Sequence, residues 1–164
     1  MAGGRPSGLE LTDDPSPEVS QESGVIDSRG RIRIPAWIAA DLSWLQAKSG
    51  GETFALAVLR EPGVLKLFDW AQYSPPVLLK RQKLIQQEDL MALRDLEDCY
   101  RRISISEERR PTLGEGALTH LGLPIGQSSA IYIFRIKDVI EIESPTFRDR
   151  RLAESGSIFS GLPG

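Results

Sequence analysis

Arginine is concentrated at two places in the chain, and this side chain is well suited to contact nucleic acids. Its planar guanidinium can donate two parallel hydrogen bonds to phosphate oxygens or to the O6 and N7 edge of guanine. The two clusters contain Arg29, Arg31, Arg33, Arg109 and Arg110. These five residues are the candidate DNA-binding side chains, and their use depends on the elements that position them.

The first cluster lies in a segment with the pattern of a tight turn between two strands. Residues 25–35 read VIDSRGRIRIP, in which aliphatic and charged residues alternate after a glycine. This alternation predicts that Arg31 and Arg33 share one face of a strand. Gly30 would let the turn approach a DNA backbone closely. Asp27 is expected to accept turn amide hydrogens and to orient Arg31, because a carboxylate repels phosphate.

A weaker copy of this segment surrounds the second cluster. Residues 103–114 read ISISEERRPTLG, again an apolar strand pattern followed by a charged turn. Relative to the first segment, Ser106 replaces the aspartate, Arg109 replaces the glycine and Gly114 replaces the proline. Pro111 is expected to interrupt the strand, and Arg110 alone matches its counterpart outright. Two such units in one chain imply an internal duplication.

The duplication extends beyond the turns. Residues 59–67 align with residues 134–142, and both segments alternate as β-hairpins do. The residues expected to share one face are Ala55, Ala57 and Leu59 in the first unit and Ile131, Ile133 and Arg135 in the second. The opposite face would hold Leu56, Val58, Tyr132 and Phe134. Apolar residues on both faces predict strands inside a closed or intertwined barrel. A short helix is expected in each unit, over residues 36–42 and 115–121, the second ended by Gly122.

The order of aspartate, glycine, arginine and proline in the first segment resembles the Asp-x-x-x-Arg signature of the MraZ and SpoVT/AbrB families of bacterial transcription regulators. Two units in one chain favour MraZ, and the resemblance covers roughly residues 24–151. It implies an α+β fold of two tandem swapped-hairpin β-barrel repeats joined by a long helix. It also implies a sequence-specific DNA-binding transcriptional regulator that forms ring-like homo-oligomers on repeated operator boxes.

The chain divides into five parts on this interpretation. Residues 1–22 form an acidic tail that is too poor in apolar side chains to fold, and residues 155–164 form a second flexible tail. The repeats would occupy residues 23–70 and 101–154, the second being degenerate. Residues 71–100 would form the linker. Within it, the run from Val77 to Asp98 lacks glycine and proline and predicts the longest helix of the chain.

The net charge of −3 is unusual for a DNA-binding protein. Residues 1–22 carry one arginine and five acidic residues, a net −4, which leaves +1 for the remainder. Local clustering of arginine decides phosphate contact more than the total does. The near-neutral remainder keeps a second interpretation open. On this alternative the chain is a non-DNA-binding interaction or antitoxin-like module that uses the same barrel for assembly.

Composition argues against catalysis. The chain has one histidine, His120, and one cysteine, Cys99, so one subunit cannot assemble a usual histidine-containing metal cluster. It contains no Walker loop and no dinucleotide-binding fingerprint. We therefore expect no enzyme activity, catalytic residue, metal or cofactor, with double-stranded promoter DNA and further copies of the chain as partners. No small-molecule substrate is expected.

The expected location is the cytoplasm, in association with the nucleoid. A single cysteine suits a reducing compartment, and no apolar run approaches the ~20 residues that span a membrane. The tryptophans Trp37, Trp44 and Trp70 are expected to pack in the core, with interface anchoring as the alternative.

Overall fold

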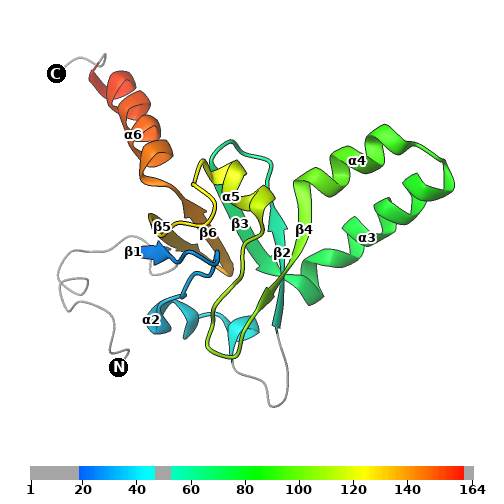
Figure 1. Cartoon of the computed structure of the whole chain (residues 1–164), viewed down its shortest axis with the longest axis horizontal. Coiled ribbons are helices and arrows are strands. Elements are labelled where there is room, and N and C mark those ends of the chain that lie inside the picture. The colour runs from blue at the N-terminus through cyan, green and yellow to red at the C-terminus, as the bar shows by residue number, and fades with distance from the viewer. Residues whose placement is uncertain (1–18, 47–52, 161–164) are drawn as a thin grey trace.

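The computed structural model describes residues 19–46 and 53–160, which form a mixed α+β protein built on one antiparallel sheet (Figure 1). Its strands are β1 (Val19–Ile26), β2 (Thr53–Val58), β3 (Val64–Asp69), β4 (Tyr100–Ile105), β5 (Ser129–Ile136) and β6 (Val139–Glu143). The strand order is β1-β5-β6-β3-β2-β4, and every neighbouring pair is antiparallel. The expected α+β class is therefore confirmed.

The helices fall into two groups. Short helices follow the two arginine turns, and longer helices follow the two central strands β3 and β6. The helical elements are α2 (Ala36–Ala39), the 3-10 turn η1 (Ser43–Leu45), α3 (Trp70–Gln86), α4 (Leu90–Cys99), α5 (Glu115–Leu121) and α6 (Pro145–Ser160). Gly122 ends α5 with a φ of 71°, as the sequence predicted.

The two halves of the chain, residues 19–69 and 100–143, exchange their first strands. β1 of the first half pairs with β5 of the second, and β4 of the second half pairs with β2 of the first. The hairpins β2–β3 and β5–β6 meet in the centre, where Lys66 on β3 lies opposite Glu141 on β6. Each half therefore completes the sheet of the other.

One face of the sheet carries the hydrophobic core. The side chains predicted to share that face are all buried: Ala55, Ala57, Leu59, Ile131, Ile133 and Arg135. Arg135 is the charged exception, and it lies 3.5 Å from the carboxylate of Asp41 while donating a 2.8 Å bond to the Lys137 carbonyl. Leu56 is also buried, but Val58, Tyr132 and Phe134 are only half-buried. The described residues thus enclose one apolar face fully and leave much of the other open.

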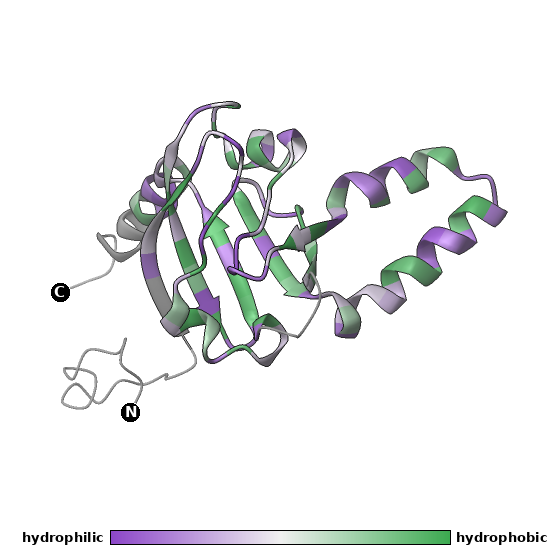
Figure 2. Cartoon of the chain, turned by 60° about the horizontal axis from the view of Figure 1, so that its bottom comes forward, coloured by the Kyte–Doolittle hydropathy of each residue, from purple (hydrophilic) through white to green (hydrophobic). Residues whose placement is uncertain are grey.

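The linker differs from the single long helix expected. α3 ends at Gln86, and the chain turns through Glu88, whose φ is 56°, before Asp89 caps α4 by accepting a bond from the Ala92 amide. The two helices form an arm that projects from the sheet (Figures 1 and 2). An ion pair from Arg81 to Glu97, 3.0 Å long, joins them.

Three further boundaries differ from the sequence prediction. Residues 19–22, assigned to the acidic tail, belong to β1, because that strand extends along β5. Residues 155–160, assigned to a flexible tail, continue α6. Pro75 and Pro76 lie inside α3, which begins earlier than expected because Asp69 accepts a 3.2 Å bond from the Ala71 amide. The remaining residues of both predicted tails lie outside the described part of the chain.

Candidate nucleic-acid interface

The two arginine turns meet in a two-stranded antiparallel ribbon, which we call the arginine ribbon. It consists of residues 30–34 and 109–113. Backbone bonds link the amides of Ile32, Ile34 and Leu113 to the carbonyls of Pro111, Arg109 and Gly30 at 3.0, 3.0 and 2.7 Å. Arg31 and Thr112 form a bridge in the same register. The two clusters, far apart in sequence, therefore become one surface.

Alternation sorts the ribbon into an inner and an outer face. The inner side chains are buried: Ile32, Ile34, Pro111 and Leu113. The outer ones are half-buried or exposed: Arg31, Arg33, Arg110 and Thr112. The predicted shared face of Arg31 and Arg33 is confirmed. Thr112 was not singled out in the sequence, although the alternation after Pro111 could have indicated it.

The first turn is organised by Asp27. Its Oδ1 accepts hydrogen bonds from the backbone amides of Arg29 and Arg31 at 2.8 and 3.0 Å, and its Oδ2 accepts one from Arg31 Nε at 2.9 Å. These bonds, led by that from the Arg31 amide, lower the pKa of the carboxyl below its usual value. The predicted role of Asp27 in accepting turn amides and orienting Arg31 is thus confirmed.

Gly30 is required by the backbone at this turn. Its φ is 80°, a left-handed conformation in which side chains are strained, and a Cβ there would lie 2.5 Å from the Leu113 carbonyl oxygen. The first turn can therefore pair closely with the second half only because residue 30 is glycine. This structural role is additional to the close approach to DNA predicted from the sequence.

The second turn repeats the backbone of the first. Ser106 donates its amide to the Arg110 carbonyl at 3.2 Å, as Asp27 does to Arg31 at 3.0 Å. Arg109 replaces glycine with a φ of 60°, and the Ser106 hydroxyl accepts a 3.3 Å bond from the Arg110 amide. Both turns therefore have the same geometry despite their different residues.

The two turns differ in charge and in side-chain support. Ser106 has no carboxylate to offer Arg110, and the buried Nε of Arg110 has no hydrogen-bond partner in the described part of the chain. The exposed acids Glu107 and Glu108 stand where the first turn has Ser28 and Arg29. Arg31 is consequently held in place by an acidic partner, whereas Arg110 has none among the described residues and follows two exposed acids in its turn.

Two residues that differ between the second segment and the first, Pro111 and Gly114, disturb the backbone less than the sequence suggested. Pro111 does not interrupt the ribbon, because its carbonyl still accepts a hydrogen bond from the Ile32 amide. The ribbon lacks only the hydrogen bond that another residue's N–H would donate at this position. Gly114 lies at the N-cap of α5, the place that Pro35 takes before α2. Both residues therefore keep the strand-to-helix transition.

The aromatic and histidine side chains contribute to the frame. Trp44 is buried, as predicted, and its Nε1 donates a 2.9 Å bond to the Asp138 carbonyl. Trp37 packs partly buried against the core, whereas Trp70 is half-buried outside it and faces Arg102. His120 Nε2 lies 2.8 and 2.9 Å from the carbonyl oxygens of Glu61 and Val64.

No group of histidine, cysteine, aspartate and glutamate able to hold a metal ion occurs within residues 19–46 and 53–160. In the same ranges, no helix has the length and apolar character needed to cross a membrane. Comparison with protein-family models and with curated proteins finds no match to this sequence. The arguments for function therefore come from the ribbon itself.

Proposed function

We propose that this protein binds double-stranded DNA and regulates transcription, with the arginine ribbon as its contact surface. One observation supports this most directly: Arg31, Arg33 and Arg110 lie on the same outer face of a two-stranded ribbon. A ribbon of this kind fits the major groove, where arginine reads guanine edges. Arg29 is exposed in the first turn, whereas Arg109 is half-buried in the second turn, opposite Ile34 in the ribbon register.

The three arginines of the outer face would have different roles. Arg31 is oriented by Asp27, so it suits base reading, which needs a fixed direction of the guanidinium. Arg33 and Arg110 stand opposite each other without an acid between them and suit contact with phosphate. Asp27 and Gly30 then act by shaping the turn.

The exchange of first strands between the halves supports a more specific fold, two swapped-hairpin β-barrel repeats of the MraZ and SpoVT/AbrB type. On this proposal the repeats are intertwined and share the sheet centre. The regulator would work in the cytoplasm, on the nucleoid. A nearly neutral subunit with one well-supported turn should bind weakly alone, so several copies on tandem operator boxes would raise the affinity.

Exposed apolar residues on the arm support self-assembly. Leu78, Leu79, Ile85, Leu90 and Met91 are between 45% and 81% exposed. Several exposed apolar side chains on one projecting element favour a protein–protein contact there. The same arm also favours the second candidate, a non-DNA-binding interaction or antitoxin-like module, because it could engage a different protein instead.

Selection of fragments from the organism's genomic DNA by the purified full-length protein, followed by sequencing, tests the proposal. We expect enrichment of one recurring sequence by the parent and its loss with Arg31→Ala. Salt dependence of binding to the enriched fragment then counts phosphate contacts, at a slope of about 0.9 for each.

Two matched variants are compared in the salt series. Arg33→Ala removes one positive charge from the arginine ribbon, and Lys80→Ala removes one from α3. A smaller slope in the first and an unchanged slope in the second supports the proposal. Absence of any enriched sequence, with a folded protein, would favour the interaction module.

A further inference from the structure

Two neighbouring cavities lie on the outer face of the sheet, the face opposite the core, and Glu61 and Val64 at the end of the first hairpin line both of them. The cavity on β2–β3 has a volume of about 600 Å³, and that on β5–β6 about 230 Å³. The hairpin registers relate them, because Val58 pairs with Lys66 in the first hairpin as Phe134 pairs with Glu141 in the second. Along the first strand of each hairpin, Arg60 therefore corresponds to Ile136, one position away from the match that the sequence alignment suggested. The two cavities can therefore be compared position by position.

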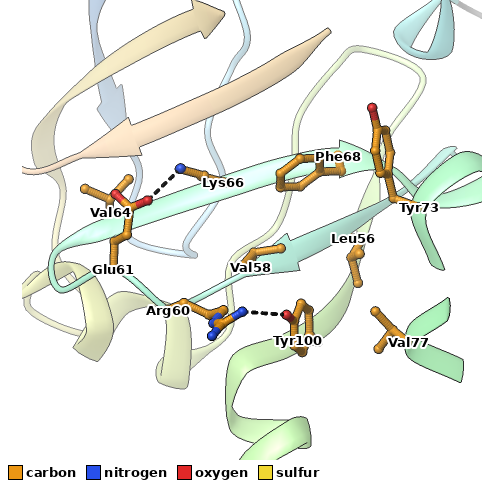
Figure 3. A pocket seen from close by; sticks show the side chains of 10 residues that line it. All are labelled: Leu56, Val58, Arg60, Glu61, Val64, Lys66, Phe68, Tyr73, Val77 and Tyr100. Atoms are coloured by element: carbon orange, nitrogen blue, oxygen red, sulfur yellow. Dashed lines mark hydrogen bonds and ion pairs between the residues drawn. The ribbon is translucent and has the colours of Figure 1, made fainter. Parts of the chain in front are cut away.

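The larger cavity has an apolar floor and aromatic walls (Figure 3). Its floor is formed by Leu56, Val58 and Phe68, and Tyr73, Val77 and Tyr100 stand around it. The rings of Phe68 and Tyr73 pack with centroids 5.0 Å apart at 60°. An antiparallel sheet normally turns polar residues to water on its open face, so this apolar patch indicates a surface built to be covered.

Positive charge stands at the mouth of this cavity. Arg60 donates a 3.3 Å hydrogen bond to the Tyr100 hydroxyl, a neutral partner, and within the described residues it forms no ion pair. Lys66 lies 2.7 Å from the Glu61 carboxylate, which it neutralises. Arg60 is therefore the cation available to an incoming anion.

The smaller cavity has the opposite character. Ile136 stands where the larger cavity has Arg60, and the acids Glu141 and Glu143 stand where it has Lys66 and Phe68. Arg151 reaches Glu143 at 2.7 Å and occupies part of the space. The larger cavity therefore combines aromatic walls with an arginine that has no acidic partner among the described residues, and the smaller cavity does not.

We propose that the cavity on β2–β3 binds a small amphipathic anion, with an aromatic body against Phe68 and Tyr73 and a carboxylate against Arg60. Its volume lies within the range of about 300–1,000 Å³ typical of small-molecule sites. A charged hydrogen bond from arginine to a carboxylate gives the orientation. This binding is separate from DNA contact and does not depend on it.

Calorimetric titration of the full-length protein with 2-naphthoate, and with its neutral analogue 2-naphthamide, tests the proposal. We expect saturable naphthoate binding, and naphthamide binding at least about tenfold weaker, because the amide lacks the charge that Arg60 meets. Naphthamide binding as tight as naphthoate binding would overturn the choice of an anion. No saturation up to about 1 mM naphthoate would overturn the site.

Variants locate the binding. Arg60→Gln should weaken naphthoate about tenfold and leave naphthamide unchanged, while Arg94→Gln, which removes an exposed arginine from α4, should change neither. Equal effects of these two variants would overturn the role of Arg60. Val58→Phe copies Phe134 of the smaller cavity and should weaken naphthoate binding by narrowing the space over the floor. If Val58→Phe does not fold, the two arginine variants and the two ligands still decide the question.

Discussion

Arg33 lies directly opposite Arg110 in the arginine ribbon, two residues along from the Arg31–Thr112 bridge. The amide bonds of Ile32 and Ile34 on either side fix this register. Like charges placed opposite each other on neighbouring strands destabilise a sheet by roughly 0.2–1 kcal/mol. A surface that brings two arginines together in this way suits an anionic partner, which would remove the repulsion on binding.

Gly30→Ala should destabilise the protein and weaken DNA binding together. The substitution places a Cβ against the Leu113 carbonyl and forces alanine to a φ of 80°, which should lower the free energy of unfolding by about 2 kcal/mol. Urea unfolding measures the change.

Gly114→Ala is the matched control for that variant. A Cβ at residue 114 meets nothing within 4 Å, and its φ of −77° suits any residue. The loss of unfolding free energy should stay below about 1 kcal/mol. Equal losses in the two variants would show that the contact between Gly30 and Leu113 does not hold the ribbon together.

The arrangement of the first turn was predictable because its determinants are local. Alternation placed Arg31 and Arg33 on one face, and the spacing of Asp27 to the following amides indicated its bonding. The left-handed conformation of Arg109 was not predicted, since arginine itself does not favour it.

The pairing of the two turns was not predictable in the same way. It depends on β1 crossing to β5 and β4 crossing to β2, contacts between residues far apart in sequence that alternation does not encode. The break between α3 and α4 could not be predicted from the sequence either, because the chain turns at Glu88 and not at a glycine or proline. The sequence predicted that both faces of these strands would be enclosed, and this was wrong for the outer face. An alternating pattern shows which residues share a face but not what covers that face.

Lowering the pH should remove the contribution of Asp27. Its folded pKa lies below the usual value, so the carboxylate stabilises the folded state above the unfolded pKa, and this contribution disappears as the pH falls through the folded pKa. We expect Asp27→Asn to be less stable than the parent at about pH 6, and the difference to shrink as the pH falls below 3.8. Urea unfolding across this range measures the difference. A difference that is constant with pH would show that the charge of Asp27 is not involved.

The purified protein should be larger than one chain in solution. Exposed leucines on the arm, Leu78 and Leu79 among them, would be covered by another copy. Light scattering at micromolar concentration gives the mass. A value of 18.1 kDa, that of a single chain, would exclude the homo-oligomer and the gain from multivalent binding.

Ser106→Asp should strengthen the second turn. The new carboxylate would stand where Asp27 stands in the first turn and could accept a bond from the unpartnered Arg110 Nε. For a partly exposed pair we expect a gain of about 0.5 kcal/mol in the free energy of unfolding, together with tighter DNA binding. Ser106→Asn is the control, because it offers an oxygen without the charge. No difference between the two would mean that the charge of the first-turn pair matters little.

The asymmetry of the turns makes the effects of two equivalent substitutions unequal. Arg31 is held by a 2.9 Å bond from Nε to Asp27, whereas Arg110 lacks an acidic partner within the described ranges. An oriented arginine discriminates guanine by about 1–3 kcal/mol. Arg31→Ala should therefore weaken binding to the selected fragment by roughly ten- to a hundredfold and relax its sequence preference.

Arg110→Ala should be milder, because it removes mainly phosphate attraction and its turn carries Glu107 and Glu108 as well. It should weaken binding to the selected fragment and to a scrambled one by similar factors, leaving preference intact. Electrophoretic mobility titrations with both fragments separate these effects, and circular dichroism with light scattering confirms that fold and assembly persist. A folded Arg31→Ala variant that binds the selected fragment as tightly as the parent would remove the first turn as the reading element. Equal losses of preference in both variants would show that the two turns read DNA alike, and that Asp27 does not set them apart.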